Sequence, residues 1–271
     1  MLTLLTLLAC EPPVEAPEEL GDLLLFTFAN FTAEEDDYLL ATVDGFQDYL
    51  LGVDMEGSTD DRAVTPPFLT TEDLGGAVAP DGADADLQVN VAVSALSTAT
   101  LAQTRTLIVD PNQVCISADS SVYYQRTFDT DADCFEDGSC DWLEVSNETR
   151  TETILADVWI DTQGEYRMVT TEDDQTVLFG RTWMPAQAVA DDGSNSWDQR
   201  YTLDLWVPHP TNTGETLRMT TMWSSVSISG VNEDLYLILV KGGLDEGFEN
   251  ATAFLAGDEC ANDRDAEYTR E

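Results

Sequence analysis

Residues 197–207, Trp-Asp-Gln-Arg-Tyr-Thr-Leu-Asp-Leu-Trp-Val, decide the fold class because their hydropathy alternates with a period of two. One face carries Trp197, Gln199, Tyr201, Leu203, Leu205 and Val207, and the other carries Asp198, Arg200, Thr202 and Asp204. Successive side chains of a β-strand point to opposite faces, so this pattern predicts a half-buried strand. Trp206 lies on the polar side of the pattern and is expected either at the surface or against a second layer of structure.

The same period occurs elsewhere in the chain. Residues 87–95 place Leu87, Val89, Val91, Val93 and Ala95 on one face, and residues 154–160 do the same with Ile154, Ala156, Val158 and Ile160. Residues 161–164 (Asp-Thr-Gln-Gly) and 211–214 (Thr-Asn-Thr-Gly) are turn signals between strands. Strands joined by turns rather than by helices predict antiparallel pairing.

Helices are predicted near both ends. Residues 32–35 (Thr-Ala-Glu-Glu) form a capping box, and apolar residues at helical spacing follow as far as Gly52. Residues 23–28 are apolar and fit a strand or a helix, while residues 71–74 fit one helical turn. Near the end, residues 235–255 place Leu244, Phe248 and Leu255 at helical spacing after an apolar run.

The sequence therefore predicts an α+β fold, with six to eight antiparallel strands and one helix near each end. This order of elements resembles that of helix-grip ligand-binding folds, and a β-sandwich with decorating helices is the alternative. We expect a signal peptide at 1–9, a lipidated tether at 10–22 and one domain at 23–271. An irregular acidic excursion is expected at 53–86.

The net charge is the most extreme property of the composition. Fifty-three acidic residues face eleven basic ones, which gives a formal charge of −42, while 43% of the residues are apolar and can form a core. Such a field repels nucleic acid and anionic lipid headgroups. We expect the charge to reflect a solubilising surface or adaptation to salt, and a cation-binding role for the whole surface is the alternative.

Four cysteines beyond Cys10 predict two disulfides in an oxidising compartment: Cys115, Cys134, Cys140 and Cys260. Three pairings are possible, and we favour Cys134–Cys140 together with Cys115–Cys260. Their spacings do not match those of zinc sites, and His209 is the one histidine of the chain.

The N-terminal residues Leu7-Leu8-Ala9-Cys10 follow an apolar run that is too short to span a bilayer. They resemble the lipobox of bacterial lipoproteins, which implies acyl chains on Cys10 and stable membrane anchoring. Residues 11–19 then form a Pro/Glu tether, and Glu11 favours the outer membrane. No Lys or Arg precedes the apolar run, so either the start codon lies upstream of Met1 or the segment is a fragment of a buried strand. Together with the acidic cysteine loop described next, these features resemble acidic lipoproteins of Gram-negative bacteria that carry no known activity.

The segment 129–141 is the densest acidic loop of the chain. Asp129, Asp131, Asp133 and Asp137 occupy positions at which an EF-hand-like loop presents oxygen ligands to calcium. Cys134 and Cys140 stand where that loop has its turn glycine and its bidentate glutamate. The alternative is a solvated acidic loop closed by a disulfide, and no other cofactor is expected.

No catalytic motif is evident: the chain lacks a Gly-x-Ser-x-Gly elbow, and the prolines beside His209 place it in a surface turn. The leading hypothesis is a non-enzymatic, lipid-anchored envelope protein that displays an acidic, disulfide-stapled domain for binding or structural duty. Its partner, protein or glycan, stays open. One alternative is a surface polysaccharide hydrolase with a carboxylate pair beside tryptophans. Another is a carrier of an apolar ligand between sheet and helix.

Overall fold

One antiparallel sheet organises the computed structural model, which describes residues 13–77, 87–153, 157–258, 260 and 270. In these residues the sheet has nine strands in the order β1-β2-β9-β8-β6-β5-β4-β3, with β7 paired to β8. The strands are β1 Ala63–Val64, β2 Val89–Ser97, β3 Ser121–Phe128, β4 Trp142–Glu152, β5 Asp157–Thr170, β6 Thr176–Trp183, β7 Ala188–Val189, β8 Ser196–Pro208 and β9 Thr216–Ser227. Every pair of neighbouring strands, including β1 with β2 and β7 with β8, is antiparallel, as predicted.

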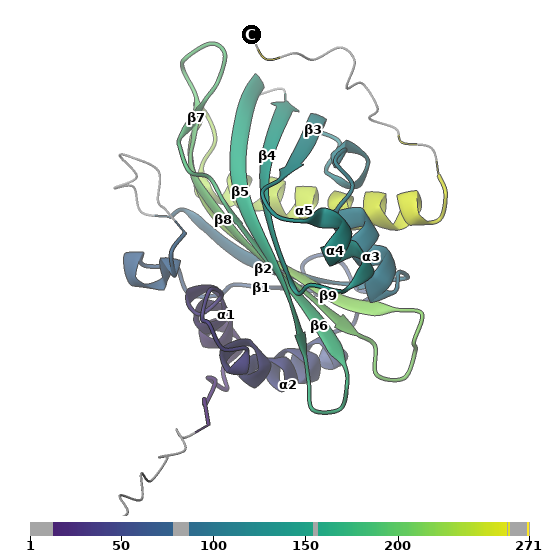
Figure 1. The fold of residues 1–271 in the computed structure, drawn as a ribbon. Helices are drawn as coiled ribbons and strands as arrows, with labels where there is room; N and C mark the ends of the chain where they lie inside the picture. Colours follow the sequence, from purple (N-terminus) through teal and green to yellow (C-terminus); the bar gives the residue numbers. More distant parts are fainter. Residues whose placement is uncertain (1–12, 78–86, 154–156, 259, 261–269, 271) are drawn as a thin grey trace, which may run out of the picture.

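Helices cover both faces of this curved sheet (Figure 1). The helices α1 Leu20–Ala29 and α2 Asp37–Gly52 pack on what we call the outer face, and α5 Glu233–Leu255 crosses the inner face. The inner face also contacts α3 Leu101–Ile108 and α4 Ala132–Asp137, and two short 3₁₀ helices are η1 Thr71–Leu74 and η2 Val114–Ile116. A single sheet with a long C-terminal helix across one face is the α+β, helix-grip-like arrangement. It excludes the β-sandwich alternative for the described residues.

The strand β8 shows why both faces are covered. Its residues Tyr201, Leu203 and Leu205 are each 1% exposed and belong to the apolar cluster beneath α1 and α2. The opposite side chains Thr202 and Asp204 are 8% and 9% exposed, because α3, α4 and α5 cover the inner face. The polar side of the strand is therefore interior, and β8 is buried on both faces rather than half-buried as its pattern predicts.

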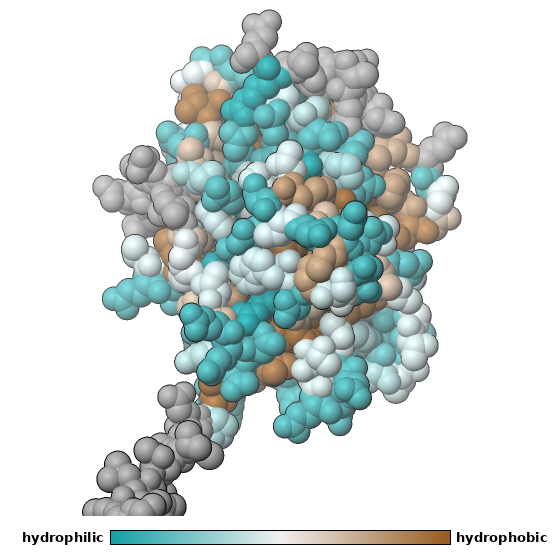
Figure 2. Space-filling model, viewed as in Figure 1, coloured by the Kyte–Doolittle hydropathy of each residue, from teal (hydrophilic) through white to brown (hydrophobic). Residues whose placement is uncertain are grey.

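The surface that remains is hydrophilic over most of the face seen in Figure 2, with apolar residues gathered in small patches. None of the helices in the described residues is both long enough and apolar enough to cross a membrane.

The first predicted helix begins later than expected. The helix α2 starts at Asp37, so the capping box predicted at Thr32 is wrong, and the Thr32 hydroxyl instead donates to the carbonyl of Gly75 at 3.2 Å. The physical reason is Arg167, whose guanidinium binds the carbonyls of Phe31 and Ala33 at 3.0 and 2.7 Å. Those carbonyls are thereby held in a non-helical turn.

The structure also shows which secondary structure two other segments near the N-terminus adopt. Residues 23–28, which fitted a strand or a helix, lie in α1, and α1 begins at Leu20, inside the stretch expected to be tether. The helical turn expected at 71–74 is confirmed as η1, where Thr70 and Asp73 form a capping box.

The turn predicted at residues 161–164 is wrong, because these residues lie inside β5 and pair with β4 along their whole length. Gly164 does not break the strand: a Cβ there would meet the side chains of Val145 and Thr182 at 3.0 Å, so the glycine permits close cross-strand packing. Val158 and Ile160 lie in β5 as predicted, whereas Ile154 and Ala156 fall outside the described residues. The turn at 211–214 is confirmed between β8 and β9.

Arg181 of β6 fastens the N-terminal helices to the sheet. Its side chain is 1% exposed, and its Nε donates to Glu165 at 2.7 Å. Its Nη1 donates to the carbonyl of Phe28 in the last turn of α1 at 3.1 Å. The guanidinium also lies 5.0–5.5 Å from the ring centres of Phe28, Phe31 and Trp183. A cation at this position satisfies a helix carbonyl and interacts favourably with the helix dipole.

Both favoured disulfides are confirmed. Cys115 of η2 bonds Cys260, which follows α5, and closes a loop with a sequence separation of 145 residues. Cys134 bonds Cys140 across the C-terminal end of α4, with a separation of six residues. The first bond fixes the far end of α5 to the inner face.

We predict that Arg181→Met lowers the free energy of unfolding by about 3 kcal/mol, because Glu165, whose side chain is only 14% exposed, is left as an unpaired charge. The double variant Arg181→Met/Glu165→Leu should recover much of this loss. The matched control is Lys241→Met, whose partner Asp60 is 83% exposed, so that change should cost below about 1 kcal/mol. Urea unfolding followed by circular dichroism measures the stability of all three variants. An Arg181→Met unfolding midpoint equal to that of Lys241→Met would contradict the structural role of Arg181.

The two disulfides should differ in what their removal costs. In the chain-entropy model the long Cys115–Cys260 loop stabilises by about 5 kcal/mol and the short Cys134–Cys140 loop by about 2 kcal/mol. We expect Cys115→Ser/Cys260→Ser to lower the melting temperature more than Cys134→Ser/Cys140→Ser. Calorimetry of the two double variants tests this, and the reverse order would show that strain or residual structure dominates.

Candidate functional site

The inner face of the sheet is the candidate site, because it is interior yet lined by many polar side chains. Two rows of paired residues cross it from β4 to β2. They are Leu143–Tyr166–Gly180–Asp204–Thr220–Val93 and Val145–Gly164–Thr182–Thr202–Met222–Val91. Each row is apolar at both ends, and small or polar residues occupy its centre.

Arg126 of β3 organises one part of this polar band. The side chain is 5% exposed, and its three nitrogens donate to Asn147 Oδ1 (2.8 Å), the Ile108 carbonyl (2.6 Å) and the Tyr166 hydroxyl (3.0 Å). Asn147 in turn donates to the Thr162 hydroxyl at 3.0 Å. Burial raises the pKa of Tyr166, so its hydroxyl stays protonated at neutral pH.

Asp204 of β8 organises the other part. Its Oδ1 accepts hydrogen bonds from the Thr220 hydroxyl and from Arg218 Nη2, the latter at 3.3 Å. Thr182 and Thr202, opposite each other on β6 and β8, share a hydrogen bond of 2.7 Å. These pairs line the centre of the face with hydroxyl and carboxylate groups.

Two arginines of this face keep unused hydrogen-bonding capacity. Within the described residues, the Nε atoms of Arg200 and Arg218 are buried and lack a hydrogen-bond partner. A buried donor without a partner costs about 1–3 kcal/mol, so such groups are uncommon unless a water or a ligand satisfies them. The inner face therefore offers donors to a bound molecule.

The helix α5 covers this face while packing mainly along one edge. Tyr236, Val240 and Phe248 contact the apolar strip of β2 and β9 that contains Val89 and Val91. The Tyr236 hydroxyl shares a hydrogen bond of 2.8 Å with Ser224, and burial raises its pKa. At the far end, α5 packs against η2.

Apolar clusters lie on both sides of the polar band. One is the α5–β2 strip, and the other joins Ile108 of α3 and Phe135 of α4 to Leu143, Leu178 and Trp206. A hollow of about 450 Å³ opens where α5 begins, lined by Gln88 and by Val231, Asn232, Glu233 and Asp234. The inner face thus combines apolar walls with a central set of hydrogen-bonding groups.

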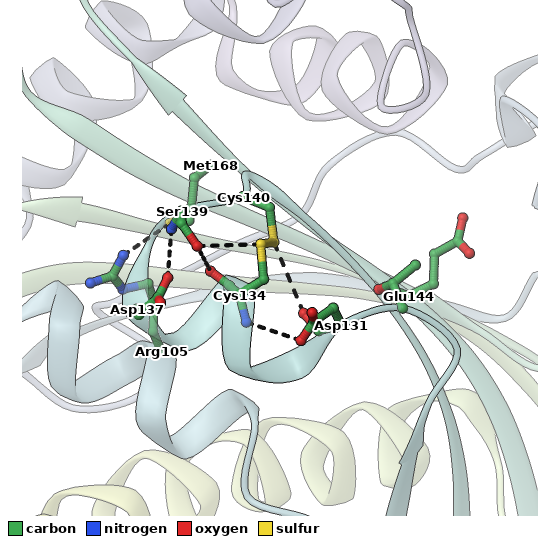
Figure 3. The surroundings of a disulfide bond; sticks show 9 residues. Arg105, Asp131, Cys134, Asp137, Ser139, Cys140, Glu144 and Met168 are labelled. Carbon is green, nitrogen blue, oxygen red and sulfur yellow. Dashed lines mark hydrogen bonds between the residues drawn. A yellow bond between two sulfur atoms is a disulfide. The ribbon is translucent and has the colours of Figure 1, made fainter.

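The acidic loop takes a different form from the predicted calcium loop. Figure 3 shows Asp131 and Asp137 at opposite ends of α4, where Asp131 caps the helix by accepting from Cys134 N at 3.1 Å and Asp137 accepts from Ser139 N at 2.8 Å. Asp129 accepts from the Ser146 hydroxyl at 3.0 Å, and Asp133 lies in the first turn of the helix. Among the described residues no group of three or more possible ligands comes close enough to hold a metal ion. The structure does not bring the four carboxylates together.

The remaining candidates are dispersed. Trp183, Trp206 and Trp223 are buried and Trp142, Trp159 and Trp197 half-buried, in several separate clusters, so the six tryptophans form no shared stacking face. His209 lies at the turn after β8, where its Nδ1 accepts from Thr211 N and Asn212 N. Cys10 and the lipobox fall outside the described residues.

The residues that line the inner face were missed by the sequence analysis. Arg200 and Asp204 were placed on the polar face of a half-buried strand, and Arg126 and Arg218 were not singled out. One available signal was Trp206, a large apolar residue on the same parity as Asp204. It indicated that this side of β8 faces a second layer.

Comparison with known proteins gives distant likenesses of fold only. No family model matches the chain, and no curated protein matches it. A STAR-related lipid transfer protein from Xanthomonas axonopodis is 10% identical, with a TM-score of 0.43 over 62% of this chain and 85% of that one. The lipid transfer and protein localization domain of human StarD13 is 10% identical, with a TM-score of 0.34 over 60% and 74%. A START superfamily protein from Mycobacterium smegmatis is 12% identical, with a TM-score of 0.32 over 61% and 98%. Likenesses this weak carry no functional argument, so the site has to be interpreted from its own geometry.

Proposed function

We propose that this chain is a binding protein that carries a mostly apolar ligand between the inner face of its sheet and α5. The observation that carries the proposal is the set of buried polar groups on that face, with the Nε atoms of Arg200 and Arg218 unpartnered. A domain with a purely structural role gains most by filling such an interior with apolar side chains. Small-molecule sites, in contrast, are mostly apolar with a few convergent polar groups.

The attachment of α5 supports the same function. Its packing along β2 and its disulfide at the far end hold the helix on one side, while the centre of the face presents Gly164, Thr182 and Thr202. These small side chains leave more space beneath a helix than the leucines and valines that line the walls. The hollow beside residues 231–234 lies at the end of α5 that no disulfide fixes.

The ligand expected here has an apolar body and at least one acceptor group. The clusters around Val91 and around Leu178 would contact the body, and Arg200 or Arg218 would donate to the acceptor. No step of bond making is required, in keeping with a non-enzymatic role. We also propose that the domain is anchored at the bacterial cell envelope through Cys10, as the lipobox implies.

Filling the site should abolish binding. The probe is N-phenyl-1-naphthylamine, an uncharged fluorophore that is insensitive to the field of a protein with a charge of −42. Wild type should bind it saturably, with the negative heat-capacity change of apolar burial. Thr182→Phe, at the half-buried centre of the inner face, should weaken binding at least about 10-fold, which corresponds to about 1.4 kcal/mol.

The matched control adds the same bulk elsewhere. Thr127→Phe, on the exposed outer side of β3, should bind like wild type. Thr182→Val removes the hydroxyl at nearly constant volume and should keep most of the affinity, which separates filling from misfolding. Equal binding by wild type and Thr182→Phe, or no saturable binding by wild type, would refute the proposal.

Anchoring is tested by mass spectrometry of the protein made in a bacterial host. We expect an N-terminal Cys10 with a diacylglyceryl group and an additional acyl chain, and partition of the protein into the membrane fraction. Cys10→Ser should keep residues 1–9 and lose the lipid mass. An unmodified Cys10 in the wild-type protein would contradict the anchor without affecting the carrier function.

A further inference from the structure

A second polar cluster lies on the outer face of the sheet, at the end that α1 and α2 leave uncovered. It consists of two short rows of paired residues on β3, β4 and β5, Tyr123–Arg150–Trp159 and Gln125–Glu148–Asp161. The side chains of one parity share a face, so these six lie together opposite the inner face. The cluster is separate from the proposed carrier site.

Two carboxylates are placed directly opposite each other in this cluster. Glu148 and Asp161 are paired across β4 and β5. Like charges directly opposite each other on neighbouring strands repel and destabilise the sheet. The neighbouring Arg150 does not neutralise these two negative charges, because its two terminal nitrogens bind Asp191 in a bidentate pair at 2.9 and 2.7 Å. This pairing raises the pKa of Arg150 and lowers that of Asp191. The pair Glu148–Asp161 is therefore a site for one further cation.

Arg270, at the far end of the chain, supplies that cation. Its Nη1 donates to Asp161 at 2.6 Å and to Glu148 at 3.4 Å. Its guanidinium carbon lies 5.7 Å from the centre of the Trp159 ring, within the range of a cation–π interaction. Two carboxylates and an aromatic ring around one guanidinium form a site of defined chemistry.

The ring is held in place independently of Arg270. Tyr123 meets Trp159 edge-on at 5.3 Å between ring centres, and the guanidinium carbon of Arg150 lies 5.6 Å from the centre of the same ring. A groove of about 200 Å³ continues from this point, lined by Trp159, Asp161, Arg270 and residues 186–189. There is thus room beside the guanidinium for the backbone that would carry such a group.

We propose that Trp159, Asp161 and Glu148 form a recognition site for the guanidinium group of an arginine-bearing peptide, and that Arg270 occupies it as an internal competitor. The charge of −42 favours the approach of a basic peptide. Arg270 is 42% exposed and its two carboxylate partners are 36% and 50% exposed, so exchange requires no unfolding of the core. An external arginine would displace Arg270 and lie along the groove beside β7.

The test compares full-length wild type with Arg270→Ala. The probe is the capped tripeptide acetyl-Gly-Arg-Gly-amide, titrated in about 0.15 M salt while NMR follows the indole N–H of Trp159. Removing a competitor that fills the site most of the time should tighten apparent binding about 3- to 10-fold. The same peptide with citrulline, the uncharged analogue of arginine, should cause no shift at Trp159.

A matched pair of variants separates this site from general attraction to an acidic protein. Arg270→Ala/Asp161→Asn should lose the binding that Arg270→Ala gains, whereas Arg270→Ala/Asp44→Asn, with the same net charge and an exposed change on α2, should keep it. Acetyl-arginine amide shows how much of the affinity the guanidinium alone provides, and binding of either probe at Trp159 supports the site. Equal effects of the two substitutions, or equal affinity of wild type and Arg270→Ala, would overturn the proposal.

Discussion

The buried guanidinium of Arg181 is the contact on which the assembly of the chain depends. It reaches from β6 through the outer face to the last turn of α1 and is neutralised by Glu165 from the adjacent strand. Phe28, Phe31 and Trp183 surround it, so the charge is enclosed by rings as well as by hydrogen bonds. This contact favours one placement of α1, because in any other placement Nη1 of the buried guanidinium would lose the Phe28 carbonyl. Arg167 acts in the same way on the carbonyls that follow α1.

Buried or half-buried arginines occur on most strands of the sheet. Each of the strands β3, β4, β5, β6, β8 and β9 carries one: Arg126, Arg150, Arg167, Arg181, Arg200 and Arg218. Arg150, Arg167 and Arg181 lie on the outer face, whereas Arg126, Arg200 and Arg218 lie on the inner face beneath α3 or α5. These six arginines are buried or half-buried, whereas Asp198 and Asp204 are the only buried carboxylates among the described residues. Each sheet face thereby receives strong hydrogen-bond donors.

The sequence predicted the sheet well where burial and periodicity agree. Val89, Val91 and Val93 line the face that α5 covers, and the turn at 211–214 joins β8 to β9. Prediction failed where a distant residue overrides a local preference. Thr32 and Glu35 carry the pattern of a helix start, but Arg167, more than 130 positions away, binds the carbonyls of this segment. Gly164 carries a turn signal, but strands on both sides pair with it. The carboxylates of the acidic loop are not gathered in the structure for a related reason, because Asp131 and Asp137 serve the ends of α4.

The sequence by itself determined the α+β class, the antiparallel pairing of the strands and the net charge of the chain. These properties follow from composition, from the period of two and from spacing, all of which are local or additive. Only the tertiary structure decided that the polar side of β8 is interior, that Arg200 and Arg218 face α5, and that Arg270 meets Trp159 and Asp161. The reason is that a polar side chain needs a hydrogen-bond partner, but the sequence does not show where that partner lies. When a second layer of helices covers the sheet, side chains that look exposed in the sequence become buried.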